Sequence, residues 1–405
     1  MRPLDGSAGV RGTRNADHAL IDDLQSVEAA DPGQMLRATA SAGAQVRETA
    51  ALAAEVDLTS LGDEGRPRAV VVAGVGTAAR TGDVLSTVAG PRCPVPVISH
   101  RSSGVPGWVG AADVVIAVSA SGRSPEALAA ADAAGRRGAR LVAIGAPDSE
   151  LQSVAERARA PFIPVPRRFN ARTSLWALTV PVLLAARALG LVKVAEADFA
   201  ETAARLDTDA ERCRPTLESF VNPGKTLALD LAGSIPILWG SSPLATVAAH
   251  RFADTLAANA RYPAVAGALL EAGRGRVGLL DGAYGALSEN ERDIFADPGE
   301  GDQDNTRIRV VLLRDGGLRD DNEDTAEESD EPASVEERRA DAVQRLAEQR
   351  GVRVSVVEAE GGSQLERLAS MVAVPDFASI YLGLAHGLDP MAVPAIQEMK
   401  ELTNS

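Results

Sequence analysis

The chain has 405 residues, which at about 150 residues per domain predicts two to three domains. Hydrophobic residues make up 45% and charged residues 24%, a balance typical of a soluble globular protein, which excludes a mostly disordered chain. The 41 Lys and Arg residues against 56 Asp and Glu residues give a net charge of −15, so nucleic acid and anionic membrane surfaces are poor partner candidates.

The first half of the chain alternates between strand and helix patterns. Residues 24–56 carry apolar residues at helical spacing. Short apolar runs then predict strands at 68–73, 94–99, 113–119, 139–145 and 161–166. Helices are predicted near 83–88, 125–137, 149–158 and 173–191. This alternation predicts a parallel sheet with helices on both faces.

The same pattern restarts after a polar-faced helical connector at 195–220. Strands are predicted at 234–240, 275–281, 307–315 and 352–359, and helices at 244–260, 335–350, 364–386 and 390–402. We therefore predict an α/β protein of two domains, each a doubly wound, mainly parallel sheet flanked by helices, over residues 1–200 and 201–405.

Two segments of the second half differ from the rest in composition. Residues 316–334 are acidic and nearly free of apolar residues, and 299–305 form a smaller loop of the same kind. We expect 316–334 to be a disordered surface insertion, with a partner-docking segment as the alternative.

Few features of the chain indicate a special compartment or a metal. Two cysteines, Cys93 and Cys213, cannot form a disulfide framework, and four histidines lack metal-ligand spacing. The N-terminus has no apolar leader, and the longest apolar run, 175–186, contains Pro181 and is too short to span a bilayer. We expect a protein of the reducing cytoplasm.

The segment 114–145 holds the strongest functional signal. A buried strand ends in Ser119, and Ser121 and Ser124 follow before a helix opens at Pro125-Glu126. Backbone N–H groups at the start of such a helix bind anions, and the serine hydroxyls add donors. The alternative is a capped helix with solvent-facing serines.

The pattern S-x-S-G-x-[ST]-x-E after a strand resembles the phosphate loop of SIS (sugar isomerase) domains. Four further segments resemble the bifunctional glucose-6-phosphate/mannose-6-phosphate isomerases in chain order: 74–83, 170–172, 234–261 and 375–400. The resemblance implies two SIS domains, a phosphosugar such as fructose 6-phosphate as ligand, aldose–ketose isomerisation, a homodimer, and no metal or organic cofactor. It implies catalytic roles for Arg172, Glu271 and Lys400, and substrate binding by Gly76, Thr77, Ser119, Ser121, Ser124, Arg251 and Arg274.

Three positions depart from that family's pattern. Ala258 stands where the family has its base Glu, Arg274 stands at the position of the ring-opening His, and Ala78 stands at a phosphate-binding Ser. Alanine cannot transfer a proton, and arginine stays protonated. Replacement bases could be Glu271 or one of the histidines, namely His100, His250 and His386.

Two functions are consistent with these residues. One is a phosphosugar isomerase that has moved its base, and the other is a non-catalytic phosphosugar-binding protein with a regulatory or structural role. A dinucleotide-binding protein is a weaker alternative, because G-V-G-T-A-A at 74–79 lacks the acidic residue expected about 20 residues later. The chain also has only three lysines, and a lysine kept among so many arginines is a candidate for work that needs a shifted pKa.

Overall fold

The computed structural model describes residues 15–168, 170–289, 306–316 and 334–404. The described residues form two compact units, each built on one parallel sheet. The sheet A unit comprises residues 38–208 and 361–369, and the sheet B unit comprises the remainder, including residues 15–37. The N-terminal helices α1 (His18–Asp22) and α2 (Leu24–Ala30) therefore belong to the unit that holds the second half of the chain.

Sheet A has five parallel strands in the order β2-β1-β3-β4-β5. The strands are β1 (Val70–Ala73), β2 (Val97–His100), β3 (Val114–Ser119), β4 (Arg140–Gly145) and β5 (Phe162–Pro164). Every residue of β1 and β3 is buried, which explains why their sequences are continuous apolar runs rather than alternating ones. All five strands confirm the sequence-based prediction to within a few residues.

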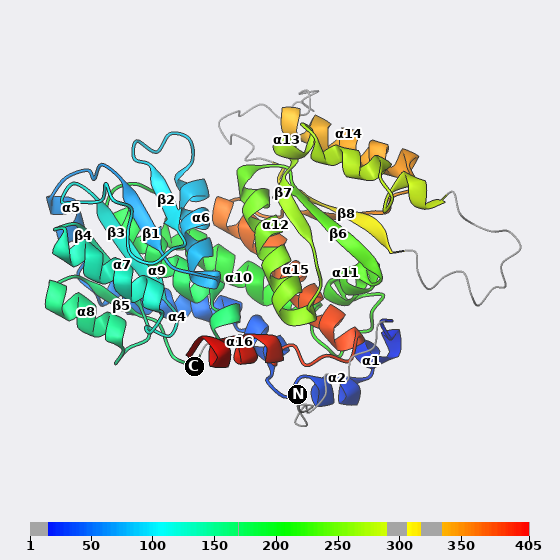
Figure 1. Ribbon diagram of the computed structural model, residues 1–405, viewed down its shortest axis with the longest axis horizontal. Helices are drawn as coiled ribbons and strands as arrows, with labels where there is room; N and C mark the ends of the chain where they lie inside the picture. Colours follow the sequence, from blue (N-terminus) through cyan, green and yellow to red (C-terminus); the bar gives the residue numbers. More distant parts are fainter. Residues whose placement is uncertain (1–14, 169, 290–305, 317–333, 405) are drawn as a thin grey trace, which may run out of the picture. The chain divides into compact units, whose positions relative to one another are not determined.

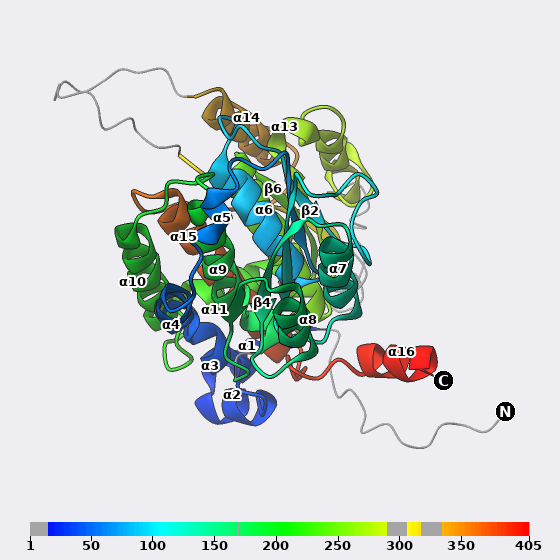
Figure 2. The same cartoon turned by 90° about the vertical axis from the view of Figure 1, so that its left-hand side faces the viewer.

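Helices cover both faces of sheet A (Figure 1). Helices α7 (Pro125–Arg136) and α8 (Glu150–Ala158) lie side by side on one face, where small alanine side chains allow close approach to the strands (Figure 2). On the other face α6 (Thr77–Ala89) packs beside α9 (Leu175–Ala188), which in turn contacts α4 (Ala42–Ala54). The remaining elements of this part of the chain are α3 (Met35–Ala40), α5 (Ser60–Asp63), η1 (Ala171–Thr173) and α10 (Glu196–Arg212).

Sheet B has four parallel strands in the order β7-β6-β8-β9. They are β6 (Ser234–Gly240), β7 (Val265–Ala268), β8 (Arg307–Arg314) and β9 (Val354–Glu358). Its helices are α11 (Pro223–Leu231), α12 (Pro243–Thr255), α13 (Leu269–Ala272), α14 (Val335–Gln349), α15 (Gln364–Ala385) and α16 (Pro394–Asn404). The segment η2 (Leu256–Ala260) continues α12 as a π-helix, and the short 3-10 segments are η3 (Arg276–Asp281) and η4 (Ala286–Glu289).

One predicted strand was wrong. Residues 275–281 form the 3-10 helix η3, and the strand at this edge of the sheet is the four-residue β7, ten residues earlier in the chain. Only Leu280 of η3 is buried, so its apolar residues do not all face a sheet. The acidic segment 316–334, apart from its first and last residues, and the loop 299–305 lie outside the described residues.

Among the described residues, α15 is the one helix that is long and apolar enough to cross a membrane by length and composition. Its most apolar window is 89% buried inside the protein. This burial identifies α15 as a core helix of a folded unit, which explains its apolar composition without a bilayer.

Candidate functional site

The path of the chain through sheet A creates a topological switch point, called here the crevice between β1 and β3, at the carboxyl ends of two neighbouring strands. From β1 the chain moves outward to β2 and then returns to place β3 on the opposite side of β1. The loops after β1 and β3 therefore leave the sheet toward different faces, and ligands of open α/β sheets bind between such loops. The loops are 74–76 and 120–124, which hold most of the predicted phosphate-binding residues.

The loop after β3 is held in shape by its own serines and one glycine. The buried Ser119 hydroxyl accepts a hydrogen bond from the Ser124 N–H at 3.3 Å, and the exposed Ser121 hydroxyl accepts one from the Arg123 N–H at 3.2 Å. Gly122 has a φ of +66°, and a Cβ there would lie 2.1 Å from Ser149 Oγ. Glycine is required here both by the backbone conformation and by space.

The start of α7 differs from the sequence-based expectation in one respect. Ser124 occupies the N-cap position, but its hydroxyl donates to the Glu126 carboxylate at 2.7 Å and does not cap a backbone N–H of the helix. This hydrogen bond lowers the pKa of Glu126 below its ordinary value. Ser124 thus leaves α7 without an N-cap side-chain hydrogen bond, and the positive end of the helix dipole lies just after β3.

The loop after β1 brings a second helix start to the same crevice. Gly74 approaches β3 so closely that a Cβ would lie 2.9 Å from the Val118 carbonyl oxygen. Gly76 precedes α6 with a φ of +59°, and Thr77 is the first residue of that helix. In the next turn Arg80 is buried and pairs with Asp83 at 3.0 Å. The structure therefore places Gly76 and Thr77 after β1 and the three serines at the end of β3 and after it, at the carboxyl ends of two paired strands; their role in binding stays a prediction.

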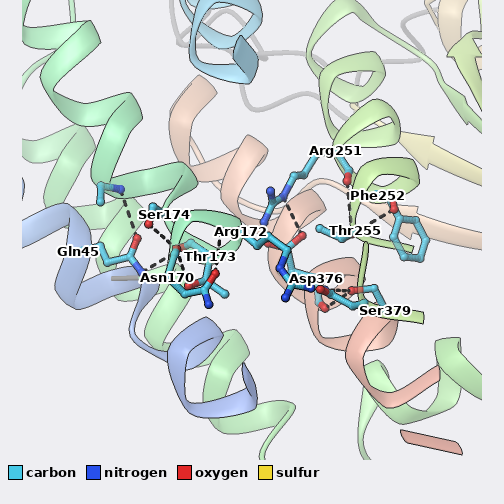
Figure 3. Close-up of polar contacts among 12 residues, drawn as sticks. Gln45, Asn170, Arg172, Thr173, Ser174, Arg251, Phe252, Thr255, Asp376 and Ser379 are labelled. Atoms are coloured by element: carbon cyan, nitrogen blue, oxygen red, sulfur yellow. Dashed lines mark hydrogen bonds and ion pairs between the residues drawn. The ribbon is translucent and has the colours of Figure 1, made fainter. Parts of the chain in front are cut away.

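Arg172 lies on η1, a short segment that packs against α6 and α9. Its backbone N–H donates to Asn170 Oδ1 at 2.9 Å, and the next carbonyl, that of Thr173, accepts from Gln45 Nε2 at 3.1 Å (Figure 3). Ser174 Oγ closes the turn by donating to the Asn170 carbonyl. These contacts fix the backbone from which the half-buried Arg172 side chain extends.

In the sheet B unit, Arg251 forms a buried bidentate ion pair. Its Nε and Nη2 donate to the two carboxylate oxygens of Asp376 at 3.0 and 2.9 Å, joining α12 to α15 (Figure 3). Burial raises the pKa of Asp376, and the guanidinium opposes that rise. The predicted substrate contact of Arg251 stays a prediction, and the geometry gives this side chain an internal partner.

Ala258 lies within the π-helix η2, where the family pattern would place a base. The next residue, Asn259, anchors this π-helical turn to α15. Its Nδ2 donates to Ser379 Oγ at 2.9 Å, and Ser379 Oγ donates to the Asp376 carbonyl at 2.7 Å. Insertions of this kind in a helix occur frequently at functional sites. The Ala258 side chain itself is a methyl group and has nothing to donate or accept.

The other predicted catalytic residues of this unit lie on its surface or in the C-terminal helix. Glu271 and Arg274 are exposed and follow the carboxyl end of β7, with the Arg274 N–H donating to the Glu271 carbonyl at 3.0 Å. Lys400 lies in α16, and its side chain is not among the described groups. Among the candidate histidines, His386 is buried beside Tyr262, with 5.7 Å between ring centroids, whereas His100 and His250 are half-buried.

Sheet B has the corresponding switch point between β6 and β8, and the Asp315 carboxylate lies there. Ser242 caps α12 by accepting from the Ala245 N–H at 3.1 Å, and its hydroxyl donates to Asp315 Oδ2 at 2.6 Å. The Asp315 N–H donates to Ser241 Oγ at 2.9 Å. Sequence reasoning missed this site, although Ser-Ser-Pro after one predicted strand and an aspartate at the end of another are a signal for it.

Lys225 is the lysine that the structure explains best. Its ammonium is fully buried and donates to the Pro215 and Leu217 carbonyls at 2.9 and 2.7 Å and to Asp22 Oδ1 at 3.2 Å. It also lies 5.5 Å from the centre of the Tyr381 ring. These contacts give Lys225 a structural role in joining the N-terminal helices to α11.

Comparisons with known proteins agree with this architecture. Residues 220–402 match the family model of the bacterial phospho-glucose isomerase C-terminal SIS domain. The C-terminal domain of glucosamine-fructose-6-phosphate aminotransferase from Francisella tularensis has the same fold, with a TM-score of 0.60, 12% identity, and coverage of 88% of this chain and 97% of that one. Residues 220–402 thus match a SIS domain by sequence, and the chain shares the fold of a SIS-type solved structure.

Two relatives match this chain over most of its length and are more similar to it in sequence. The bifunctional phosphoglucose/phosphomannose isomerase of Caldicellulosiruptor bescii is 26% identical over 82% of this chain and 88% of its own length. That of Aquifex aeolicus is 25% identical over 76% of this chain and 81% of its own length. Over most of its length, this chain therefore resembles the bifunctional phosphoglucose/phosphomannose isomerases.

Proposed function

We propose that this protein binds a sugar phosphate and holds its phosphate in the crevice between β1 and β3 of sheet A. The observation that carries the proposal is the start of α7, where the N-cap Ser124 gives its hydroxyl proton to Glu126 and does not cap a backbone N–H of the helix. Ser121 is exposed beside them and can donate its hydroxyl proton to a phosphate oxygen. Resemblance to isomerases of phosphosugars supports a sugar as the remainder of the ligand.

The chemistry of isomerisation favours a binding function over catalysis. Aldose–ketose conversion moves a proton between C1 and C2, which needs a group of suitable pKa within hydrogen-bond reach. Ala258 cannot take that proton, and Arg274, at the position of the ring-opening His, stays charged. We therefore infer that the chain binds its phosphosugar in a regulatory or structural role, as a cytoplasmic homodimer, and turns it over slowly or not at all.

A relocated base is the second candidate function. Glu271 is exposed and lies on the short helix directly after the carboxyl end of β7, the edge of a parallel sheet at which ligands bind. A carboxylate in that place could act as the base of an isomerase, with Arg172 and Lys400 holding charge on the substrate. Loss of turnover in Glu271→Gln would support this candidate.

One experiment separates binding from turnover. Isothermal titration with fructose 6-phosphate is expected to give saturable binding, whereas unphosphorylated fructose gives none. Coupled assays for glucose 6-phosphate and mannose 6-phosphate are expected to show no turnover above background. Absence of fructose 6-phosphate binding would overturn the proposal, and turnover that disappears in Arg172→Ala would establish the isomerase instead.

Restoring the missing base gives a matched pair of variants. Ala258→Glu introduces a carboxylate at the family position of the base, and Ala258→Gln introduces a side chain of the same size that cannot take a proton. If the base at position 258 is the one catalytic group that the chain lacks, the turnover of Ala258→Glu exceeds that of Ala258→Gln by about 10²-fold. This is the lower end of the range for a positioned general base. Equal rates in the two variants would mean that more than the base has been lost.

A further inference from the structure

A second cavity of the sheet A unit lies at the amino-terminal edge of the sheet. Its volume is about 640 Å³, within the range of small-molecule sites. It is lined by α5, by the ends of α7 and α8, and by the starts of β4 and β5. Because β3 and β4 are each six residues long, this cavity is about 20 Å from the carboxyl edge that holds the phosphate crevice.

The cavity is positively charged in a chain of net charge −15. Four arginines and two carboxylates line it, which gives a net charge of +2. The arginines are Arg136, Arg140, Arg157 and Arg159, and the carboxylates are Glu64 and Asp132. A local reversal of sign against an acidic background attracts anions.

Helix ends explain three of these arginines. Arg136 and Arg157 lie in the last turns of α7 and α8, and Arg159 is the C-cap of α8. Cations are favourable at the negative end of a helix dipole. Arg136 and Arg157 also share the Asp132 carboxylate, at 2.7 and 3.9 Å. These residues alone do not require a ligand.

Arg140 is different, because it opens a strand and its side chain is only 9% exposed. Nη1 donates to the carbonyls of Leu61 and Gly65 at 2.9 and 3.0 Å. Among the described residues, the buried Nε has no hydrogen-bond partner, and the Glu64 carboxylate stands 3.7 Å from it and is 66% exposed. A buried charged donor that has only this longer ion pair and no hydrogen bond is costly, and a guanidinium is well suited to a phosphate or carboxylate.

We propose that this cavity is a second anion site, which binds a small organic polyanion with one charged group against Arg140. A further charged group of the ligand lies toward the cavity mouth, where the exposed Arg157 is available from α8. Phosphate and carboxylate groups share the chemistry that the guanidinium recognises. The site is separate from the phosphate crevice and does not depend on the proposed function.

The test uses the full chain with the phosphate crevice closed by Ser121→Asp, titrated with sodium pyrophosphate and, separately, with citrate. One saturable site is expected for at least one of these anions, and the anion that binds identifies the charged group. Arg140→Gln in this background weakens binding at least about tenfold, as loss of a charge-assisted hydrogen bond should. Arg157→Gln weakens it about threefold, as the loss of one partly solvated charge near the ligand should.

Arg137→Gln is the matched control. Arg137 is exposed, follows α7, and donates to the Pro106 carbonyl at 2.8 Å without lining the cavity. The affinity of this variant stays within about twofold of the parent, because the substitution removes a charge of the same type outside the site. Should Arg140→Gln not fold, the exposed Arg157→Gln decides the question against the same control. The proposal is overturned if neither anion binds, or if the cavity variants bind as tightly as Arg137→Gln.

Discussion

Sheets A and B follow similar strand paths but keep a buried carboxylate at opposite edges. In sheet A, Asp113 precedes β3 at the amino edge and accepts two hydrogen bonds from Arg68, at 2.9 and 2.6 Å. In sheet B, Asp315 follows β8 at the carboxyl edge and accepts from Ser242 at 2.6 Å. The carboxyl edge of sheet B therefore holds a buried carboxylate, whereas at the carboxyl edge of sheet A the Ser124 hydroxyl meets Glu126, which is only half-buried.

The helices that follow these two crevices, α7 and α12, also differ in how their N-terminal ends are capped. Ser242 caps α12 through its hydroxyl, whereas Ser124 gives its hydroxyl proton to Glu126 and leaves α7 without a side-chain cap. The comparison teaches that this fold offers an anion site at each point where the strand order reverses. The side chains at that point decide whether a ligand or the protein itself fills it.

The largest effect is expected from distorting the open crevice. Gly122→Ala forces a Cβ to within 2.1 Å of Ser149 Oγ at a φ of +66°, so the loop after β3 must move. We expect fructose 6-phosphate binding to weaken at least about 100-fold by titration calorimetry, because the loop N–H groups lose their alignment. Gly104→Ala is the control and should bind normally, since Gly104 has a φ of +76° and a Cβ there would meet no atom within 4 Å.

The second prediction removes the Asp315 carboxylate from the crevice between β6 and β8. Asp315→Ala removes the acceptor of the Ser242 hydroxyl and is expected to lower the free energy of unfolding by about 1–3 kcal/mol in urea titrations. Asp341→Ala, which breaks the partly exposed pair with Arg314 in the same unit, should cost about 0–1 kcal/mol. Equal losses would mean that Asp315 is no more than a surface charge.

The amino edge of sheet A gives a pH-dependent prediction. The hydrogen bonds from Arg68 hold the pKa of Asp113 below its ordinary value, so the ionised form stabilises the fold at pH values above about 4. This contribution is lost as the pH falls through the lowered pKa. Asp113→Asn should therefore be less stable than the wild type at pH 7, and the difference should shrink as the pH falls below about 4. A difference that is constant with pH would contradict this account.

The smallest effect is expected at Ser124. Because its hydroxyl proton is directed to Glu126, Ser124→Ala should weaken fructose 6-phosphate binding only about threefold, less than Ser121→Ala. The same substitution in the closed crevice, Ser242→Ala, removes a helix cap and should lower the free energy of unfolding by about 1 kcal/mol. A larger binding loss for Ser124→Ala than for Ser121→Ala would reverse the assigned roles.

Much of the fold could be predicted from the sequence because the strands of parallel sheets are buried on both faces. Continuous apolar runs such as 234–240 mark such strands clearly, and β6 has these bounds. The edge strand β7 carries no such signal, since its four residues are only partly buried and include Gly267. The apolar residues of 275–281 mimic a strand in the sequence, although they form a 3-10 turn.

The positions of candidate site residues could be predicted from the sequence only where they lie in a local motif. The serine loop at 119–124 and the glycine loop at 74–76 follow strands that pair, so sequence order places them together. The ion pair of Arg251 with Asp376 joins residues 125 positions apart, and no local pattern announces it. The same holds for Lys225, which the composition presents as a candidate for chemistry and which is a buried structural cation.

The central claim is that the crevice between β1 and β3 holds a phosphate. Its most direct test places a carboxylate there, as Asp315 already stands in the crevice between β6 and β8. Fructose 6-phosphate is titrated into the wild type, Ser121→Asn and Ser121→Asp by calorimetry. We predict binding to the wild type, binding within about tenfold to Ser121→Asn, and a loss of at least about 100-fold in Ser121→Asp, because only the charge differs between the two variants. Equal affinities of Ser121→Asp and Ser121→Asn would show that the phosphate is not held between β1 and β3.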